Sequence, residues 1–320
     1  MEEGSERLMI NSMQYTHARL SSNSNRSLPQ QFNTVPIQVH PQLFGQVRHI
    51  LPSGSTYFQS PQQAELVQST LGKENILAIM PTGSGKSLAF FSAPYLDPTG
   101  LYIVVTPLTA LTEDMGRRLG QNHSIRGGIY PQFSEQNGQL VFVAAHLAGS
   151  DRFFSWLDPQ ESRLRRVFVD ECHHIYLSST YRACFRLFHK LTGLKKPFTF
   201  LSSTVLPQSI ELLCSAMGIS RPTLRIIRAP IARPNISYSV TRIREEDDMI
   251  AKVTSFCCKF LLNADDRGII YSTTIADAKL LAEALGCDYY VSKVDEDPET
   301  NAKKKRAVMQ RWQEGKETAN

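Results

Sequence analysis

The stretch Ile79-Met80-Pro81-Thr82-Gly83-Ser84-Gly85-Lys86-Ser87 decides the fold, because it combines two glycines with a Lys-Ser pair. An apolar run at 75–80 precedes it and an apolar helical pattern follows at 87–93. Glycines let the backbone fold tightly, so successive N–H groups can converge on phosphate oxygens at the amino end of the helix. The pattern in this context predicts a phosphate-binding loop. Lys86 would pair with the β- and γ-phosphates of a nucleotide, and Ser87 would ligate Mg²⁺.

Short apolar runs alternate with helical patterns around this loop. Runs rich in Val, Ile and Phe predict strands at 75–80, 101–106, 139–144, 166–169 and 197–201. Helical patterns lie at 63–71, 87–93, 111–119 and 181–191. This alternation predicts an α/β fold with a mostly parallel sheet and helices on both faces.

A second set of elements begins after the proline-marked stretch 229–234. We expect strands at 235–240, 267–271 and 288–294, with helices at 246–262, 276–285 and 302–312. Three strands are too few for a well-filled sheet, so this second unit reads as incomplete. The predicted organisation is a flexible polar leader over 1–44, a nucleotide-binding domain over 45–230 and a partial domain over 231–320.

Composition excludes several classes of protein. The chain has 320 residues, of which 42% are hydrophobic and 20% charged, so wholesale disorder is excluded. Its formal charge of +5 permits a polyanionic partner without implying one. No apolar run approaches the roughly 18 residues that a membrane span needs. The six cysteines form no CxxC pair, which indicates reduced thiols in an intracellular compartment and no zinc module.

A second apolar strand ends in two carboxylates, in Val167-Phe168-Val169-Asp170-Glu171-Cys172-His173. The carboxyl end of a parallel strand lies at the ligand-binding edge of the sheet, on the same side as the phosphate loop. Asp170 would hold the Mg²⁺ shell, and Glu171 would orient or deprotonate the attacking water. Capping of the next helix by these acids is the less favoured alternative. Zinc at Cys172-His173-His174 is not favoured, because three adjacent side chains do not converge easily on one ion.

With these two motifs in place, the chain resembles RecQ-type superfamily-2 DNA helicases from about Leu43 onward, with their telomere-linked branch as a finer placement. Phe58-Gln59-Ser60-Pro61-Gln62-Gln63 is similar to the family's nucleotide motif, whose glutamine reads the adenine edge. That role falls on Gln63, with Gln62 as the alternative, and the family's arginine is Gln59 here. Tyr102-Ile103-Val104-Val105-Thr106-Pro107-Leu108 resembles a motif that contacts nucleic acid, which implies contacts at Thr106 and Pro107.

The remaining motifs follow in the family's order. Asp170-Glu171-Cys172-His173 matches the DExH box, in which His173 links the nucleotide and DNA sites, and Ser202 and Thr204 match a motif that couples hydrolysis to domain movement. Arg233-Pro234-Asn235-Ile236 resembles the segment that joins the two domains, and Gly268-Ile269-Ile270-Tyr271-Ser272 resembles the opening motif of the second domain. The resemblance implies tandem RecA-like P-loop domains, ATP and Mg²⁺ as cofactors, and 3′-to-5′ unwinding of DNA at single-strand/duplex junctions in the nucleus.

Departures from the family pattern keep other functions open. In place of the aromatic-rich loop stand Tyr176 and Tyr181, which either stack on DNA bases or pack against the sheet. The later second-domain motifs, including the arginine finger, are not found, and Arg311 lies too early to serve. We therefore expect ATP binding with poor turnover. The alternatives are a truncated ATP- and DNA-binding protein without unwinding activity, or an RNA helicase. The basic run 303–306 reads as a solvated helix face, with phosphate contact or nuclear import as alternatives.

Overall fold

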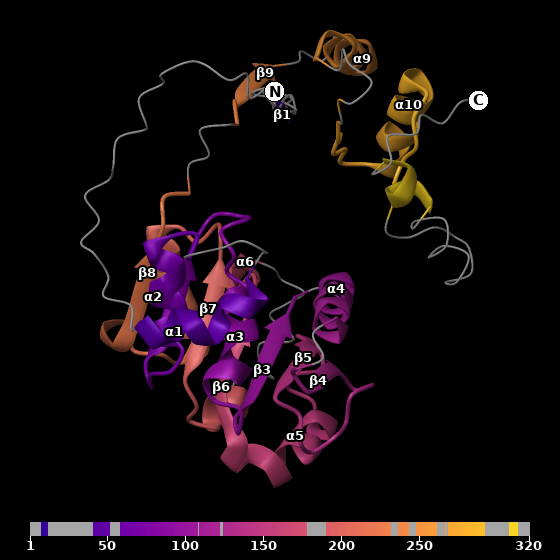
Figure 1. Ribbon diagram of the computed structural model, residues 1–320. Helices are drawn as coiled ribbons and strands as arrows, with labels where there is room; N and C mark the ends of the chain where they lie inside the picture. Colours follow the sequence, from indigo (N-terminus) through magenta and orange to yellow (C-terminus); the bar gives the residue numbers. More distant parts are fainter. Residues whose placement is uncertain are drawn as a thin grey trace. The chain divides into compact units, whose positions relative to one another are not determined.

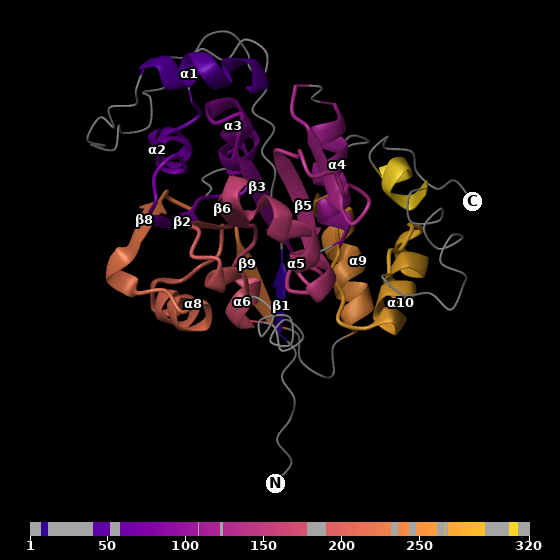
Figure 2. The ribbon, with the colours of Figure 1, turned by 90° about the horizontal axis from the view of Figure 1, so that it is seen from below.

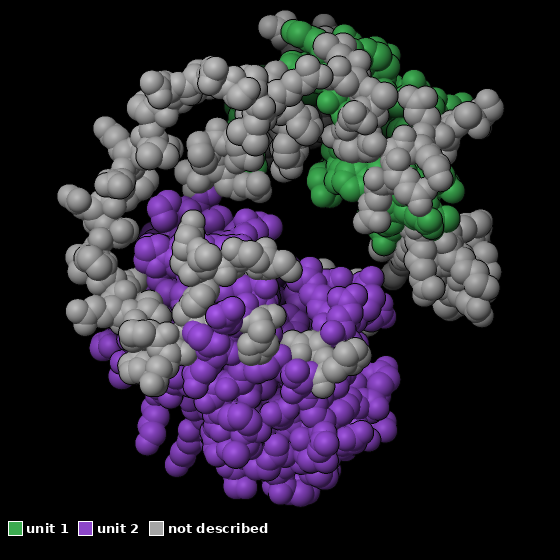
Figure 3. Space-filling view, viewed as in Figure 1, with its two compact units in different colours: residues 1–22, 234–320 green, residues 23–233 purple. Residues whose placement is uncertain are grey.

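The computed structural model describes most of the chain (Figure 1). The described residues are 8–11, 41–51, 58–107, 109–121, 124–177, 190–231, 236–242, 248–260, 266, 268–291 and 307–312. They belong to two compact units, one of residues 23–233 and one of residues 1–22 with 234–320 (Figure 3). Predictions on Tyr181, 233–235 and 303–306 lie outside the described residues, and the domain limits drawn from the sequence stay predictions.

The larger unit is built on a seven-stranded parallel sheet in the order β4-β5-β3-β6-β7-β2-β8. The strands are β2 (Asn75–Ile79), β3 (Leu101–Thr106), β4 (Gly127–Tyr130), β5 (Leu140–Ala144), β6 (Leu164–Val169), β7 (Phe198–Ser202) and β8 (Leu224–Arg228). This confirms the α/β class and all five strands predicted for the first domain. The prediction missed β4 and β8, which are the two edge strands: an edge is less buried, so its sequence carries a weaker apolar signal.

Helices cover both faces of this sheet (Figure 2). One face carries α1 (Pro41–Val47), α2 (Pro61–Ser69), α3 (Leu88–Leu96) and α4 (Thr109–Gly120). The other carries α5 (Asp151–Leu157), α6 (His174–Leu177) and α8 (Ile210–Met217). Single 3₁₀ turns lie at Arg48–Ile50, Asp158–Arg163, Pro207–Ser209 and Arg221–Thr223.

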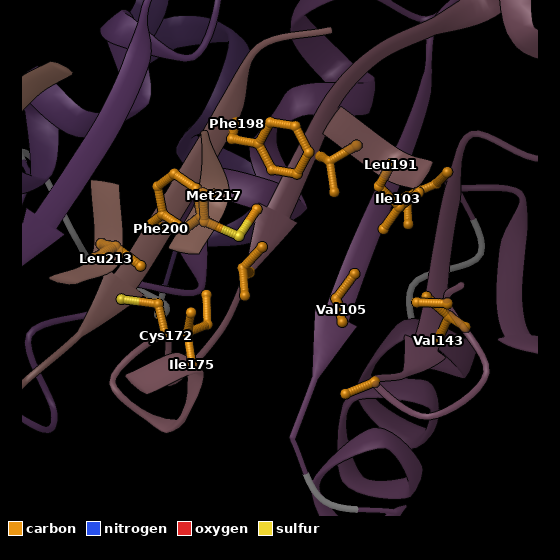
Figure 4. Packing of buried hydrophobic residues seen from close by; sticks show 14 of the residues in the cluster. Ile103, Val105, Val143, Cys172, Ile175, Leu191, Phe198, Phe200, Leu213 and Met217 are labelled. Atoms are coloured by element: carbon orange, nitrogen blue, oxygen red, sulfur yellow. The ribbon is translucent and has the colours of Figure 1, made fainter. Parts of the chain in front are cut away.

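Alternation along each strand divides the core between the two faces. Ile76 and Ala78 of β2 pack with α2 and α3, whereas Leu77 and Ile79 pack on the opposite side. Figure 4 shows part of that second cluster, where side chains from β3, β5 and β7 meet those of α6 and α8. Because strand side chains alternate, a sheet covered on both faces buries every position, which explains the near-continuous apolar runs in the sequence.

The smaller unit differs from the prediction in its strands. Helices α9 (Met249–Phe260) and α10 (Ile275–Leu285) form as expected, and residues 307–312 are helical. The strands expected at 267–271 and 288–294 are not formed in the part that the structure describes, 268–291, where Tyr271 is 90% exposed. An apolar segment becomes a strand only when a neighbour takes up its backbone hydrogen bonds, and these segments have no such partner within the described range.

One strand of the smaller unit pairs with the amino-terminal segment. β9 (Ser239–Arg242) forms an antiparallel pair with β1 (Leu8–Asn11), in the register Leu8 to Arg242. Together with α1, which begins at Pro41, this strand corrects the expectation that residues 1–44 hold no regular structure. No helix in the described part of the chain has the length and apolar character to cross a membrane.

Candidate nucleotide-binding site

The phosphate loop connects β2 to α3. Gly83 and Gly85 have φ angles of 81° and 71°, in the left-handed region that favours glycine. Ser84 N–H donates to Pro81 O at 3.2 Å, and the first helical bond runs from Leu88 N–H to Gly85 O at 3.0 Å. Among the described residues, no acceptor takes up the N–H groups of Gly83, Gly85, Lys86 and Ser87. The loop therefore offers a set of backbone donors to an anion, as predicted from its sequence.

Lys86 lies folded back onto this loop. Its Nζ donates to Met80 O at 2.9 Å and to Pro81 O at 3.1 Å. Burial lowers the pKa of Lys86, and the negative charges of Glu171 and Asp170 partly offset that effect. The ammonium group is thus within electrostatic reach of both carboxylates that end β6. A bound phosphate can take the place of these two neutral carbonyl groups, because its hydrogen bond to the ammonium group is charge-assisted and stronger.

The two acids differ in environment. Asp170 N–H donates to Val105 O at 2.9 Å, and Asp170 Oδ1 accepts from Glu171 N–H at 3.0 Å. Burial, and next the charge of Glu171, raise the pKa of Asp170 to about 6. A hydrogen bond from His173 lowers the pKa of Glu171, whose φ of 47° is strained for a residue with a side chain. Strain of this kind clusters at functional sites, where the surrounding structure holds it.

His173 and the end of β7 connect these acids to the phosphate loop. His173 Nδ1 and Ser202 Oγ are 2.8 Å apart, and Glu171 Oε2 lies 3.2 Å from the same nitrogen. Ser202 Oγ accepts from Thr204 N–H at 3.1 Å, while Ser202 O accepts from Met80 N–H at 3.0 Å. Ser202 of the predicted coupling motif thus connects His173 to the start of the phosphate loop, and Thr204 donates to Ser202.

The donor set suits Mg²⁺, which prefers oxygen ligands and usually takes one or two from the protein and others from substrate phosphates. Asp170 is a buried carboxylate, and Ser87 stands at the N-cap of α3 without using its hydroxyl to cap it. The buried Ser84 Oγ lacks a hydrogen-bond partner among the described residues. No group of three or more His, Cys, Asp or Glu side chains in the described ranges could hold an ion alone. Asp170 and Ser87 would therefore share the ion with phosphate oxygens.

Asp170→Asn raises the free energy of unfolding at neutral pH, because it removes a buried charge. Because the pKa of Asp170 is raised in the folded protein, the wild type is most stable below pH 4, where this carboxyl group is neutral. It loses this stability as the pH rises to about 6 and the group ionises. At roughly 1.4 kcal/mol per pKa unit, the variant gains up to about 3 kcal/mol above pH 7. Urea unfolding from pH 4 to 8 measures this. Asp158→Asn, at an exposed position, is the control, and equal pH profiles for wild type and Asp170→Asn would contradict the expectation.

The residues predicted to contact nucleic acid are buried or half-buried in the structure. Thr106 is 0% exposed and its hydroxyl is hydrogen-bonded to that of Thr112, so its side chain is not available for a contact. Pro107 is half-buried at the end of β3. Tyr176 packs against the core cluster and is hydrogen-bonded to Ser209, and burial raises its pKa. Packing, one of the two alternatives for Tyr176, is what the structure has.

Two further residues bear on the sequence predictions. Arg311 Nε lies 2.8 Å from Asp288 Oδ2, and Trp312 Nε1 donates to Gly268 O at 3.3 Å. Arg311 therefore has a partner in its own unit.

Sequence reasoning missed Arg166 of β6, which is 0% exposed and enters the sheet among carbonyl groups. No local pattern distinguishes such an arginine from a surface one.

Comparisons with known proteins show what the chain is similar to. Residues 60–213 match the DEAD/DEAH box helicase family. The chain is 27% identical over 252 residues to ATP-dependent DNA helicase Q-like 4B of Arabidopsis thaliana, covering 70% of this chain and 21% of that one. It is 25% identical over 251 residues to ATP-dependent DNA helicase RecQ of Synechocystis sp., covering 72% and 51%. The chain thus spans about half of the length of the Synechocystis relative and about a fifth of the Arabidopsis relative.

A solved structure shares the fold. The DUF1998 helicase MrfA bound to DNA superposes with a TM-score of 0.65 at 17% identity, covering 88% of this chain and 44% of that one. At 17% identity, this likeness concerns the fold alone. Residues 60–213 therefore match the DEAD/DEAH box helicase family, and the chain is similar to RecQ-type helicases over about 70% of its length.

Proposed function

We propose that this chain is the motor part of an ATP-dependent DNA helicase of RecQ type, which binds MgATP at the phosphate loop and moves 3′-to-5′ along DNA. The observation that carries the proposal is the convergence of unpaired loop amides, Lys86 and the two β6 carboxylates. Relatives named ATP-dependent DNA helicases support the substrate class, as does the DNA in the MrfA structure. Direction of movement and junction preference are part of the proposal and rest on the family resemblance.

The geometry assigns a step to each residue. The N–H groups of Gly83, Gly85, Lys86 and Ser87 bind the phosphates. Lys86 exchanges Met80 O and Pro81 O for phosphate oxygens. Glu171, kept ionised by its low pKa, accepts a proton from the attacking water. Ser87 and Asp170 would hold Mg²⁺, whose chemistry there would be neutralisation of phosphate charge. His173 contacts both Glu171 and Ser202. A movement of the Glu171 carboxylate is therefore transmitted through His173 to Ser202, at the end of β7.

Lys86→Ala tests the nucleotide site. Loss of a charge-assisted bond to phosphate weakens binding of a fluorescent ATP analogue by about 10- to 100-fold, and DNA-stimulated ATP hydrolysis falls to background. Lys73→Ala provides the control, because Lys73 is an exposed lysine just before β2, the strand that precedes the phosphate loop. Unchanged binding and hydrolysis in Lys86→Ala would show that the nucleotide site is wrongly assigned.

A second candidate function is a binder of ATP and DNA that does not unwind. It is favoured by the smaller unit, whose described residues between 268 and 291 form no strand. A strand-separation assay with a 3′-tailed DNA duplex distinguishes the two functions. ATP-dependent separation supports the helicase, whereas DNA binding without separation supports the binder. An RNA competitor that stimulates ATP hydrolysis better than DNA would instead favour an RNA helicase.

A further inference from the structure

Thr112 is a polar side chain on the buried face of α4. The next positions on that face, Met115 and Leu119, are apolar and pack in the core. Thr112 is 2% exposed, and its hydroxyl group is hydrogen-bonded to that of Thr106, which is 0% exposed. A buried hydroxyl group is costly unless it is hydrogen-bonded, and hydrogen bonds are directional. The pair therefore favours one position of α4 on the end of β3.

Thr106 is the last residue of β3, at the carboxyl edge of the sheet. Its carbonyl oxygen accepts from Ala145 N–H at 3.0 Å, directly after β5. The carbonyl oxygen of the preceding residue, Val105, accepts from Asp170 N–H at 2.9 Å, directly after β6. The Thr112 hydroxyl group is therefore bonded to the neighbour of the residue that holds the backbone of Asp170.

The outer face of α4 carries two arginines. Arg117 and Arg118 have side chains that are 71% and 56% exposed, and each lies 3.0 Å from Asp114. Exposed ion pairs of this kind are weak, so phosphate groups can compete for both arginines. The inner face packs so closely on β4 that a Cβ built on Gly116 would overlap the side chain of Ile129. Because this contact is close, a shift of α4 is not absorbed between the helix and the sheet.

We propose that Thr112 is a positioning residue, which transmits the binding of DNA at α4 to the backbone of Asp170. DNA phosphates that bind Arg117 and Arg118 shift the preferred position of α4. Through the hydroxyl pair, that shift acts on the end of β3 and on the carbonyl group to which Asp170 N–H donates. The proposal rests on the proposed function, since it requires that DNA stimulates ATP hydrolysis.

Thr112→Val tests this link, because valine keeps the shape of threonine and removes only the hydroxyl group. ATP hydrolysis by the full chain is measured without DNA and across a range of single-stranded DNA concentrations. We expect the stimulation by DNA to fall about 10-fold, in the usual range for coupling between two sites, while the rate without DNA stays within about twofold. Thr112→Ser keeps a hydroxyl group and should keep the stimulation. Thr223→Val, at an exposed position, is the matched control.

Unchanged stimulation in Thr112→Val, or an equal loss in Thr112→Ser, would overturn the inference while leaving the proposed function intact. Thr106→Val combined with Thr112→Val should lose no more stimulation than Thr112→Val alone, because both substitutions remove the same contact. Additive losses would show that the two hydroxyl groups act separately, against the inference.

Hydrogen exchange of the wild type provides a measurement that does not depend on the folding of a variant. DNA should slow exchange at the Asp170 amide, and exchange that DNA leaves unaltered would contradict the link to α4. A wild type whose ATP hydrolysis does not respond to DNA would overturn the proposed function, and the inference with it.

Discussion

Glu171→Gln slows the hydrolysis of bound ATP by about 10²- to 10⁴-fold, the usual contribution of a positioned general base. Glutamine keeps the size and the strained backbone position of Glu171 but cannot accept a proton from water. The wild-type residue is suited to that role because a hydrogen bond from His173 lowers its pKa, which keeps the carboxylate ionised at neutral pH. The affinity for MgATP should change less than about threefold, because Glu171 acts on water rather than on phosphate.

Single-turnover measurement, with the chain in excess over ATP, isolates the hydrolysis step from product release. Glu74→Gln serves as the control, because Glu74 is exposed just before β2. A hydrolysis rate in Glu171→Gln within threefold of wild type would assign the base to another group. Loss of ATP affinity without loss of rate would place Glu171 among the binding residues instead.

Arg166→Met lowers the free energy of unfolding by about 4 kcal/mol or more, among the largest effects of a single substitution. The guanidinium lies fully buried within β6. Its Nε and Nη2 donate to Thr70 O at 2.9 Å and Gly72 O at 2.7 Å. Its Nη1 donates to Glu74 O, Phe198 O and Thr199 Oγ1 at 3.0, 3.2 and 3.1 Å.

The cost arises because methionine fills the space but leaves three buried acceptors, Thr70 O, Phe198 O and Thr199 Oγ1, without their donor, at about 1–3 kcal/mol each. Burial lowers the pKa of Arg166 to about 10, so the side chain remains charged at neutral pH. Denaturant unfolding measures the loss. Arg165→Met, which removes an exposed ion pair with Asp97, should cost less than about 1 kcal/mol. An equal loss in the two variants would contradict the role of buried hydrogen bonds.

Arg166 also explains how the site is positioned. It connects the turn after α2 to β6, the strand that Asp170 directly follows. Thr70 and Arg166 are 96 positions apart in the chain. Replacement by lysine should not restore stability, because one ammonium group cannot present the planar set of donors that five acceptors use.

Much of the site could be predicted from short stretches of sequence. The glycines of the phosphate loop, the apolar run before it and the acids that end β6 are each contained within about ten residues. Local backbone chemistry and side-chain periodicity act over that range, so they indicate elements and their order. Edge strands such as β4 and β8 escaped prediction because their partial exposure weakens the apolar pattern.

What the sequence by itself determined is therefore the local chemistry: a parallel α/β fold, a phosphate loop, and carboxylates at a strand end. Only the tertiary structure decided which polar groups are buried and with what partner. It engages Gln63 with Gly85, buries Thr106 beside Thr112, and surrounds Arg166 with carbonyl groups. It also leaves residues 268–271 without a strand partner among the described residues. The physical reason is that burial and hydrogen bonding depend on segments distant in the chain, which no local pattern encodes.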